Sequence, residues 1–175
     1  VSTCATCDGA FYKGKNVVVV GGGDSSMEES TFLTKFADNV TILHRGAEFR
    51  ASKIMQERVF NNKKIKVMYN EEIEEILGDG KKVSGVKLKS GKEISCDGVF
   101  LAIGHIPNTN FLKGLVNLDD FGYVKTSRRY HTNVEGIFAA GDVQDTLYRQ
   151  AISAAGSGCC AALEAERYLA DKGYH

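Results

Sequence analysis

Residues 15–69 alternate short β-branched runs with segments of helical spacing. The run KNVVVV ends at three consecutive glycines, a pattern typical of a buried parallel strand. The next segment has helical spacing, and its expected inner face consists of Met27, Phe32, Leu33 and Phe36. The predicted elements are a strand over Lys15–Val20, a helix over Asp24–Phe36, a strand over Asn39–His44, a helix over Ser52–Phe60 and a strand over Ile65–Tyr69. This order predicts one half of a doubly wound, Rossmann-like α/β fold.

The pattern changes after residue 71. Glu72–Leu77, Val83–Lys89 and Lys92–Ser95 alternate apolar and polar residues, with glycine-containing turns between them. These segments predict an antiparallel meander that forms a third layer against the sheet. Val99–Ile103 then reads as another buried strand, which Gly104 ends.

A second region is expected beyond a boundary near residues 104–110. Tyr123–Thr126 and Ile137–Ala140 have the composition of strands, and Arg149–Leu169 predicts one long helix. We therefore expect one domain over residues 1–106 and a second over residues 107–175.

Composition excludes several classes of protein. Apolar residues make up 43% of the chain, and 22 basic residues balance 22 acidic ones. With no basic stripe and no apolar run near the roughly 18 residues of a membrane span, we expect neither nucleic-acid nor membrane binding. The five cysteines do not have the spacing of a secreted disulfide framework, so a cytoplasmic location is expected.

A glycine-rich turn stands between the first predicted strand and helix. In the motif Gly21-x-Gly23-x-x-Ser26, the glycines allow a tight turn and close approach of a pyrophosphate. The start of the helix then offers free N–H groups to that anion. The alternative is an ordinary glycine turn of an α/β domain.

Basic residues follow the second predicted strand. Folds that bind NAD place Asp or Glu there, whereas this strand ends at His44-Arg45 and Arg50 follows in the loop. Guanidinium groups bind a 2′-phosphate that a carboxylate would repel. The sequence thus favours NADP over NAD, with solvated surface arginines as the alternative.

Cys4-Ala5-Thr6-Cys7 is a single CxxC motif. A structural zinc site needs two more ligands at regular spacing, and Cys96, Cys159 and Cys160 are scattered, so no metal site is expected. An isolated dithiol of this spacing suits thiol–disulfide exchange. Asp8 follows directly and is a candidate proton donor to a departing thiolate.

The segment GIFAAGD predicts a buried strand that runs into Gly141-Asp142. Its carboxylate would emerge at the carboxyl end of a sheet, where α/β proteins bind ligands. The helix that opens near Arg149-Gln150-Ala151 could present its first turn to an electron-rich ring. A packed strand with a solvent-facing aspartate is the alternative.

Together these motifs resemble the low-molecular-weight thioredoxin reductases of bacteria and plants. The resemblance spans nearly the whole chain and rests on motifs in a fixed order, namely CATCDG, GGGDSSMEE, HRGAEFRAS, AIGHIPNT, GIFAAGDVQD and YRQAISAAGSGC. It implies an enzyme that passes electrons from NADPH through FAD to the Cys4–Cys7 disulfide and on to thioredoxin. It also implies a homodimer for the full-length enzyme.

The resemblance assigns roles residue by residue. Cys4 would attack the substrate disulfide, Cys7 would face the flavin, and Asp8 would be the general acid. The residues implied for NADPH are Gly21, Gly23, Asp24, Ser25, Ser26, His44, Arg45, Arg50, Ile103 and Gly104. Those implied for FAD are Gly141, Asp142, Arg149, Gln150 and Ala151, with Asp142 on the ribityl chain.

Two departures qualify the resemblance. The family often has a second arginine directly after the first, and Gly46 occupies that position here. The family also begins with an FAD-binding strand and a GxGxxG motif, which this sequence does not contain. We therefore expect residues 1–106 to be the NADPH-binding domain and residues 107–175 to be the C-terminal portion of an FAD-binding Rossmann-like domain. The chain by itself is expected to be inactive and to bind FAD weakly.

Two alternative functions remain open at this point. The flavoprotein reductase of an alkyl hydroperoxide system uses a similar core and CxxC motif. A non-catalytic NADP-binding remnant would retain the same glycine-rich turn without electron transfer.

Overall fold

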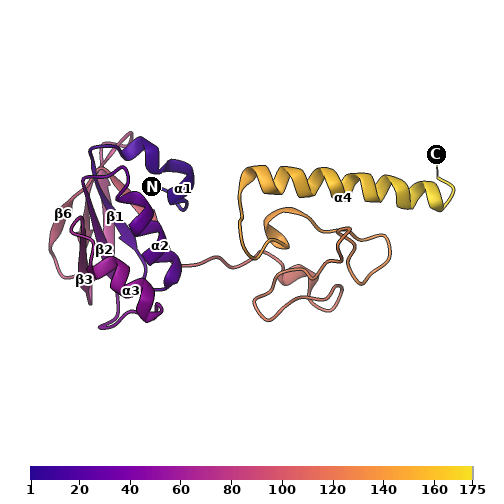
Figure 1. Ribbon diagram of the computed structural model, residues 1–175, viewed down its shortest axis with the longest axis horizontal. Coiled ribbons are helices and arrows are strands. Elements are labelled where there is room, and N and C mark those ends of the chain that lie inside the picture. Colours follow the sequence, from indigo (N-terminus) through magenta and orange to yellow (C-terminus); the bar gives the residue numbers. More distant parts are fainter. Residues whose placement is uncertain (175) are drawn as a thin grey trace. The chain divides into compact units, whose positions relative to one another are not determined.

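A computed structural model of the chain describes residues 1–174. The chain forms two compact units, Val1–Gly104 and His105–His175 (Figure 1).

The first unit contains all the strands of the described chain and three of its helices. Its elements, in order, are α1 (Ala5–Asp8), the 3-10 turn η1 (Gly9–Tyr12), β1 (Asn16–Val20), α2 (Asp24–Leu33), β2 (Asn39–His44), α3 (Lys53–Phe60), β3 (Ile65–Tyr69), β4 (Ile73–Gly78), β5 (Val83–Leu88), β6 (Glu93–Ser95) and β7 (Gly98–Leu101). The predicted α/β fold is confirmed, and each predicted strand of this unit agrees with an observed one within two residues. The short helix at the CxxC motif was not predicted.

The four-stranded sheet is wholly parallel and has the order β3-β2-β1-β7. Successive side chains of β1 point to opposite faces of the sheet. Val17 and Val19 belong to the core on the helical face, whereas Val18 belongs to the core on the other face. The continuous apolar run of β1 follows from this burial on both sides.

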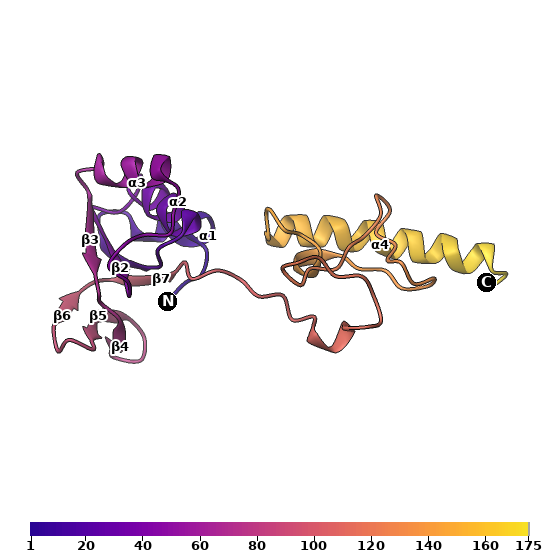
Figure 2. The same ribbon diagram turned by 90° about the horizontal axis from the view of Figure 1, so that it is seen from below.

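Helices α1, α2 and α3 cover one face of the sheet (Figure 2). Met27 and Leu33 of α2 are fully buried, as predicted for its inner face. Phe32 and Phe36 are half-buried, and both lie beside Gly9 of η1. The helix itself ends at Leu33, three residues before the predicted end.

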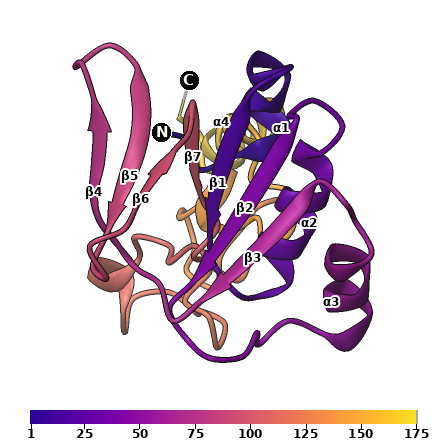
Figure 3. The ribbon, with the colours of Figure 1, turned by 90° about the vertical axis from the view of Figure 1, so that its left-hand side faces the viewer.

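The predicted meander, β4-β5-β6, is antiparallel and covers the opposite face (Figure 3). Val86 and Leu88 of β5 share a core with Val18 of β1 and Val99 of β7. Cys96 is buried in the same core, where burial raises the pKa of its thiol. The three predicted layers are therefore confirmed.

The second unit consists of the 3-10 turns η2 (Asn110–Leu112) and η3 (Gly141–Val143), irregular segments, and α4 (Ala151–Asp171). The prediction of strands at Tyr123–Thr126 and Ile137–Ala140 is wrong. Among the described residues these segments form only single bridges, Leu118 with Val124 and His131 with Phe138. A strand needs a ladder of successive hydrogen bonds, and single bridges do not supply one.

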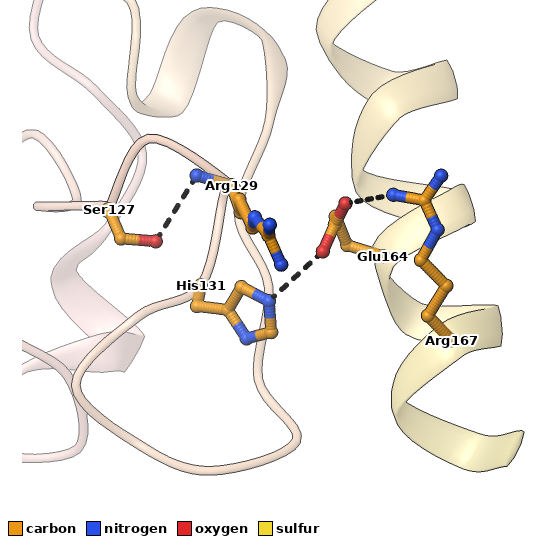
Figure 4. Close-up of polar contacts among 5 residues, drawn as sticks. All are labelled: Ser127, Arg129, His131, Glu164 and Arg167. Carbon is orange, nitrogen blue, oxygen red and sulfur yellow. Dashed lines mark hydrogen bonds and ion pairs between the residues drawn. The ribbon is translucent and has the colours of Figure 1, made fainter. Parts of the chain in front are cut away.

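A cluster of polar side chains joins the irregular segments of this unit to α4 (Figure 4). The carboxyl group of Glu164, on α4, accepts from Arg167 and lies 3.6 Å from Nε2 of His131. The His131 ring also packs on Phe138, at 4.7 Å between centroids. Burial alone would raise the pKa of Glu164, but bonds from Arg167 and His131 and the charge of Arg129 lower it.

We expect replacement of Glu164 by glutamine to lower the melting temperature of the chain at pH 7. The lowered pKa means that the carboxylate stabilises the fold above the ordinary glutamate pKa of about 4.3, and that this contribution disappears as pH falls through the lower folded value. The difference between wild type and Glu164→Gln should therefore shrink below about pH 4. Thermal melts from pH 3 to 7 measure it. Glu166→Gln, which removes an exposed charge from the same helix, should change little; equal effects of the two variants would contradict the prediction.

Several apolar side chains of the second unit are exposed. Ile152 is 83% and Leu163 is 47% exposed, and Ile137 and Phe138 are partly exposed. Among residues 1–174, no helix combines the length and the apolar character that crossing a membrane requires.

Candidate functional site

A pocket of about 580 Å³ lies at the carboxyl ends of the parallel strands in the first unit. Residues that follow β1, β2, β3 and β7 line it, in keeping with the rule for ligand sites in α/β sheets. Its lining includes eight of the predicted nucleotide-binding residues: Gly21, Gly23, Ser25, His44, Arg45, Arg50, Ile103 and Gly104. The structure thus brings together residues from four separate stretches of the sequence.

The three glycines of the turn differ in their surroundings. A Cβ atom at Gly21 would overlap the carbonyl oxygen of Ala102 and lie 2.7 Å from Cβ of Ser26. A Cβ at Gly22 would overlap the ring of His44, whereas a Cβ at Gly23 would meet no protein atom within 4 Å. Gly21 and Gly22 are therefore required by the protein's own packing. Gly23 leaves open space at the pocket, which suits close approach of a ligand.

The loop after β2 is fastened to the glycine turn through its backbone. The N–H of Arg50 donates to the Gly22 carbonyl at 2.8 Å, and the N–H of Ala51 donates to the same oxygen at 3.1 Å. The N–H of Ser52 donates to Oδ1 of Asp24 at 2.7 Å. Asp24 lies outside the pocket lining and holds the loop in place, so its direct contact with the nucleotide stays a prediction. Arg50 is thereby fixed at the pocket with an exposed side chain.

His44 and Ser26 lie beneath the turn. The His44 ring is buried, packs on Phe49 at 5.4 Å between centroids, and has Nε2 2.9 Å from the Glu48 carbonyl. Ser26 is fully buried, and its hydroxyl donates to the Gly23 carbonyl at 2.8 Å. Arg45, in contrast, is exposed at the rim. Direct nucleotide contact by His44 or Ser26 stays a prediction; in this structure both support the shape of the turn.

Glu71 is a pocket residue that the sequence reasoning missed. Its Oε2 accepts from the Ser90 hydroxyl at 2.6 Å, and its Oε1 lies 2.9 Å from Nζ of Lys92. The Ser90 bond, followed by Lys92, lowers the pKa of the carboxyl group. Its position just after β3 was the available signal, since carboxyl ends of parallel strands meet at one edge.

The two cysteines of the CxxC motif form a disulfide. Cys4 precedes the first turn of α1, and its Sγ accepts a hydrogen bond from the Cys7 N–H at 3.1 Å. Cys4 is half-buried and Cys7 is exposed. Neither belongs to the lining of the glycine-turn pocket, so the structure does not place the disulfide in that pocket.

Asp8 ends α1 and is half-buried. Burial raises the pKa of Tyr12, and the charges of Asp8 and Asp97 add to that rise. Asp8 therefore lies close enough to the segment after the disulfide to act electrostatically on it. Its role as general acid stays a prediction.

The residues predicted for FAD lie around the start of α4 in the second unit. Asp142 is exposed on η3, and the Gly141 N–H donates to the Ser157 hydroxyl at 3.0 Å. Gln150 caps α4 in a reciprocal arrangement with Ser153. Ala151 is the first residue of the helix.

Asp145 organises the loop between these residues and was missed by the sequence reasoning. Its carboxylate accepts from the backbone N–H groups of Leu147, Tyr148 and Arg149. Burial alone would raise its pKa, but those N–H donors outweigh burial and lower it. The Arg149 guanidinium donates to the hydroxyl of Tyr123 at 3.2 Å, so this side chain is held within its own unit.

The amino-acid sequence of this chain is similar to those of known proteins. A family model described as pyridine nucleotide-disulphide oxidoreductase matches residues 1–158. A thioredoxin reductase of Mycolicibacterium smegmatis is 57% identical over 178 residues, which cover 98% of this chain and 57% of that protein. A thioredoxin reductase of Rickettsia conorii is 54% identical over 177 residues, which cover 97% of this chain and 57% of that protein.

The fold is also similar to that of a solved thioredoxin reductase. The crystal structure of thioredoxin reductase from Streptococcus pyogenes is similar with a TM-score of 0.90 at 40% identity, over 97% of this chain and 57% of that one. The present chain thus spans about 57% of the length of the relatives that it matches. Since the family model covers most of its residues, the chain belongs to the pyridine nucleotide-disulphide oxidoreductase family.

Proposed function

We propose that this chain is the NADPH-binding and disulfide-bearing part of a thioredoxin reductase that also uses FAD. The observation that carries the proposal is a CxxC disulfide on the same unit as a glycine-turn pocket with two exposed arginines. The names of the similar proteins favour thioredoxin reduction over the hydroperoxide-linked reductase and over a non-catalytic remnant.

The pocket fits a dinucleotide phosphate. Gly23 leaves room for a pyrophosphate beside the first turn of α2, and Arg45 and Arg50 lie at the rim where a 2′-phosphate would be bound. When bound, NADPH supplies a hydride. The protein's contribution is to hold the phosphates and orient the nucleotide, and Asp24 keeps the arginine loop in position.

We expect the chain to bind NADPH more tightly than NADH, and Arg50→Ala to remove most of that preference. A hydrogen bond to a charged group contributes about 1.5–3 kcal/mol, which corresponds to a roughly 10- to 150-fold loss of NADPH affinity. NADH affinity should hardly change, because NADH lacks the 2′-phosphate. Calorimetric titration of both nucleotides measures the difference.

Arg58→Ala is the matched control for this experiment. Arg58 is an exposed arginine on α3 that does not line the pocket. If Arg58→Ala and Arg50→Ala weaken NADPH binding equally, the effect is one of net charge. Equal affinities of the wild type for the two nucleotides would exclude the 2′-phosphate site.

FAD would be contacted by residues of the second unit. Asp142 is exposed and available for the ribityl hydroxyls, and the first turn of α4 begins at Ala151 beside the Asp145 loop. When bound, FAD passes the electrons from the nicotinamide to the disulfide. Within the proposal, Cys7 is the cysteine that would accept these electrons.

The disulfide exchange follows from the chemistry of the dithiol. After the Cys4–Cys7 bond takes up two electrons and two protons, the Cys4 thiol gives its proton to Asp8, and the resulting thiolate attacks one sulfur of the thioredoxin disulfide. A mixed disulfide forms, and the departing thioredoxin thiolate takes a proton, for which Asp8 is the proposed donor. The Cys7 thiol then attacks Sγ of Cys4 and passes its proton to the second thioredoxin sulfur, which leaves; this restores the Cys4–Cys7 disulfide and releases reduced thioredoxin.

A chimera tests the proposed function directly. This chain replaces the matching segment of the M. smegmatis relative, with which it shares 57% identity. The chimera should be yellow, should reduce thioredoxin with NADPH, and should do so as a homodimer in the cytoplasm of its host. A flavin-loaded chimera that reduces a peroxiredoxin partner but not thioredoxin would overturn the assignment.

A further inference from the structure

Glu29 is a half-buried acidic residue to which the proposed mechanism gives no role. It lies on α2, the helix against which Ala5 of α1 packs. Its Oε2 is inaccessible to solvent and accepts no hydrogen bond from the described residues. Buried polar oxygens are usually hydrogen-bonded, and an orphaned carboxylate oxygen costs free energy. Such a residue calls for a functional reason.

The environment of Glu29 disfavours its negative charge. Burial raises the pKa of its carboxyl group, and the neighbouring charge of Glu28 raises it further. The backbone N–H of Ala5, which donates towards the carboxyl group, offsets part of this rise. The backbone N–H that partly offsets the raised pKa of Glu29 thus belongs to the residue directly after Cys4.

Cys4 depends on the same short stretch of backbone. Its Sγ accepts from the Cys7 N–H at 3.1 Å, and Ala5 stands between the two cysteines. In the reduced protein, that N–H would stabilise a Cys4 thiolate. A carboxylate at the Ala5 N–H and a thiolate at the Cys7 N–H would place two negative charges against one turn of backbone. Like charges at such proximity oppose each other's ionisation.

We propose that Glu29 is a positioning residue for the redox dithiol: its carboxyl group holds the backbone at Ala5 and, when ionised, opposes formation of the Cys4 thiolate. This inference rests on the proposed redox role of the disulfide. Reduction of that disulfide consumes two electrons and two protons, and an ionised Glu29 favours retention of the proton on the Cys4 thiol.

Other ionisable groups surround α2. Glu28 is the charged neighbour on the same helix, and Asp8 is the carboxyl group on α1. The other helix against α2 is α3, whose ionisable residues are Lys53, Glu57 and Arg58. Glu28 is exposed, which makes it the matched control for removal of one negative charge from this helix.

The test is the pH dependence of Cys4 alkylation in the reduced 175-residue chain. The chain is reduced with a phosphine, treated with iodoacetamide from pH 5 to 10, and digested, so that mass spectrometry follows Cys4 separately from the other cysteines. Glu29→Gln should lower the midpoint for Cys4 by about 1 pH unit, which means roughly tenfold faster alkylation at pH 7. Glu28→Gln should shift it far less.

Two outcomes overturn the inference: an unchanged midpoint in Glu29→Gln, or equal shifts in both variants. Circular dichroism establishes that the variants fold. If Glu29→Gln does not fold, a measurement on the wild-type chain tests the coupling instead. In the reduced chain, the ¹³C chemical shift of the Glu29 carboxyl carbon should show an inflection at the pH where Cys4 titrates. The oxidised chain should lack it, and its absence from the reduced chain contradicts the coupling. Failure of the chimera to reduce thioredoxin would leave these readouts intact, so the two proposals fail separately.

Discussion

Replacement of Cys4 by serine in the chimera is expected to abolish NADPH-dependent reduction of thioredoxin. Turnover should fall by ~1,000-fold or more, because the attacking nucleophile is lost and a serine hydroxyl cannot form a disulfide. NADPH-dependent reduction of ferricyanide, which takes electrons from the flavin, should persist at a similar rate. Parallel assays with thioredoxin and ferricyanide measure the two steps.

The control for this prediction is a cysteine outside the CxxC motif. Cys159 is exposed on α4 and unpaired, so Cys159→Ser should leave both assays unchanged. A Cys4→Ser chimera that still reduces thioredoxin at the wild-type rate would mean that the disulfide is structural. Loss of ferricyanide reduction as well would point to a damaged fold.

The second large effect is expected at Gly21. An alanine there would overlap the Ala102 carbonyl and crowd Ser26, both parts of the packed turn between β1 and α2. Overpacking of this kind costs about 1–3 kcal/mol. For a domain of about 100 residues, the melting temperature should therefore fall by roughly 4–24 °C. Thermal unfolding followed by circular dichroism measures the change.

Gly23→Ala is the informative partner of that variant. Its Cβ would meet no protein atom within 4 Å, so the melting temperature should stay near the wild-type value. NADPH binding should nevertheless weaken, because the methyl group takes the space that a pyrophosphate needs. Normal NADPH affinity in Gly23→Ala would show that the nucleotide does not use this turn. A stable Gly21→Ala variant would contradict the packing argument.

The sequence was most informative where burial dictates residue type. Val17, Val18 and Val19 are buried on both faces of the sheet, and such a strand admits few residues other than β-branched ones. The meander was equally predictable, because alternation marks strands with one buried face. The strand predicted at Tyr123–Thr126 does not form, because a segment of strand-like composition makes no ladder without neighbouring strands to pair with.

The candidate site was predictable at its glycines and arginines, where a motif connects residue type to a ligand. Glu71 was missed because its partner, Lys92, is distant in the sequence. Asp145 was missed because its partners are local backbone N–H groups, which no residue pattern marks. Glu29 was missed because a glutamate within a helical segment resembles any solvated surface residue. Only the folded structure, in which α1 packs on α2, shows that one of its carboxylate oxygens is inaccessible to solvent.

The fastening of the arginine loop bears on how coenzyme preference can change. The loop is held by N–H groups of Arg50, Ala51 and Ser52, and none of these bonds involves the guanidinium of Arg50. Loop geometry is therefore independent of the side chain at position 50, and a neutral or acidic residue could replace the arginine without loosening the loop. Coenzyme choice is thus an evolvable property of this scaffold. A lineage could exchange one nucleotide for the other by single substitutions, each passing through a stable protein.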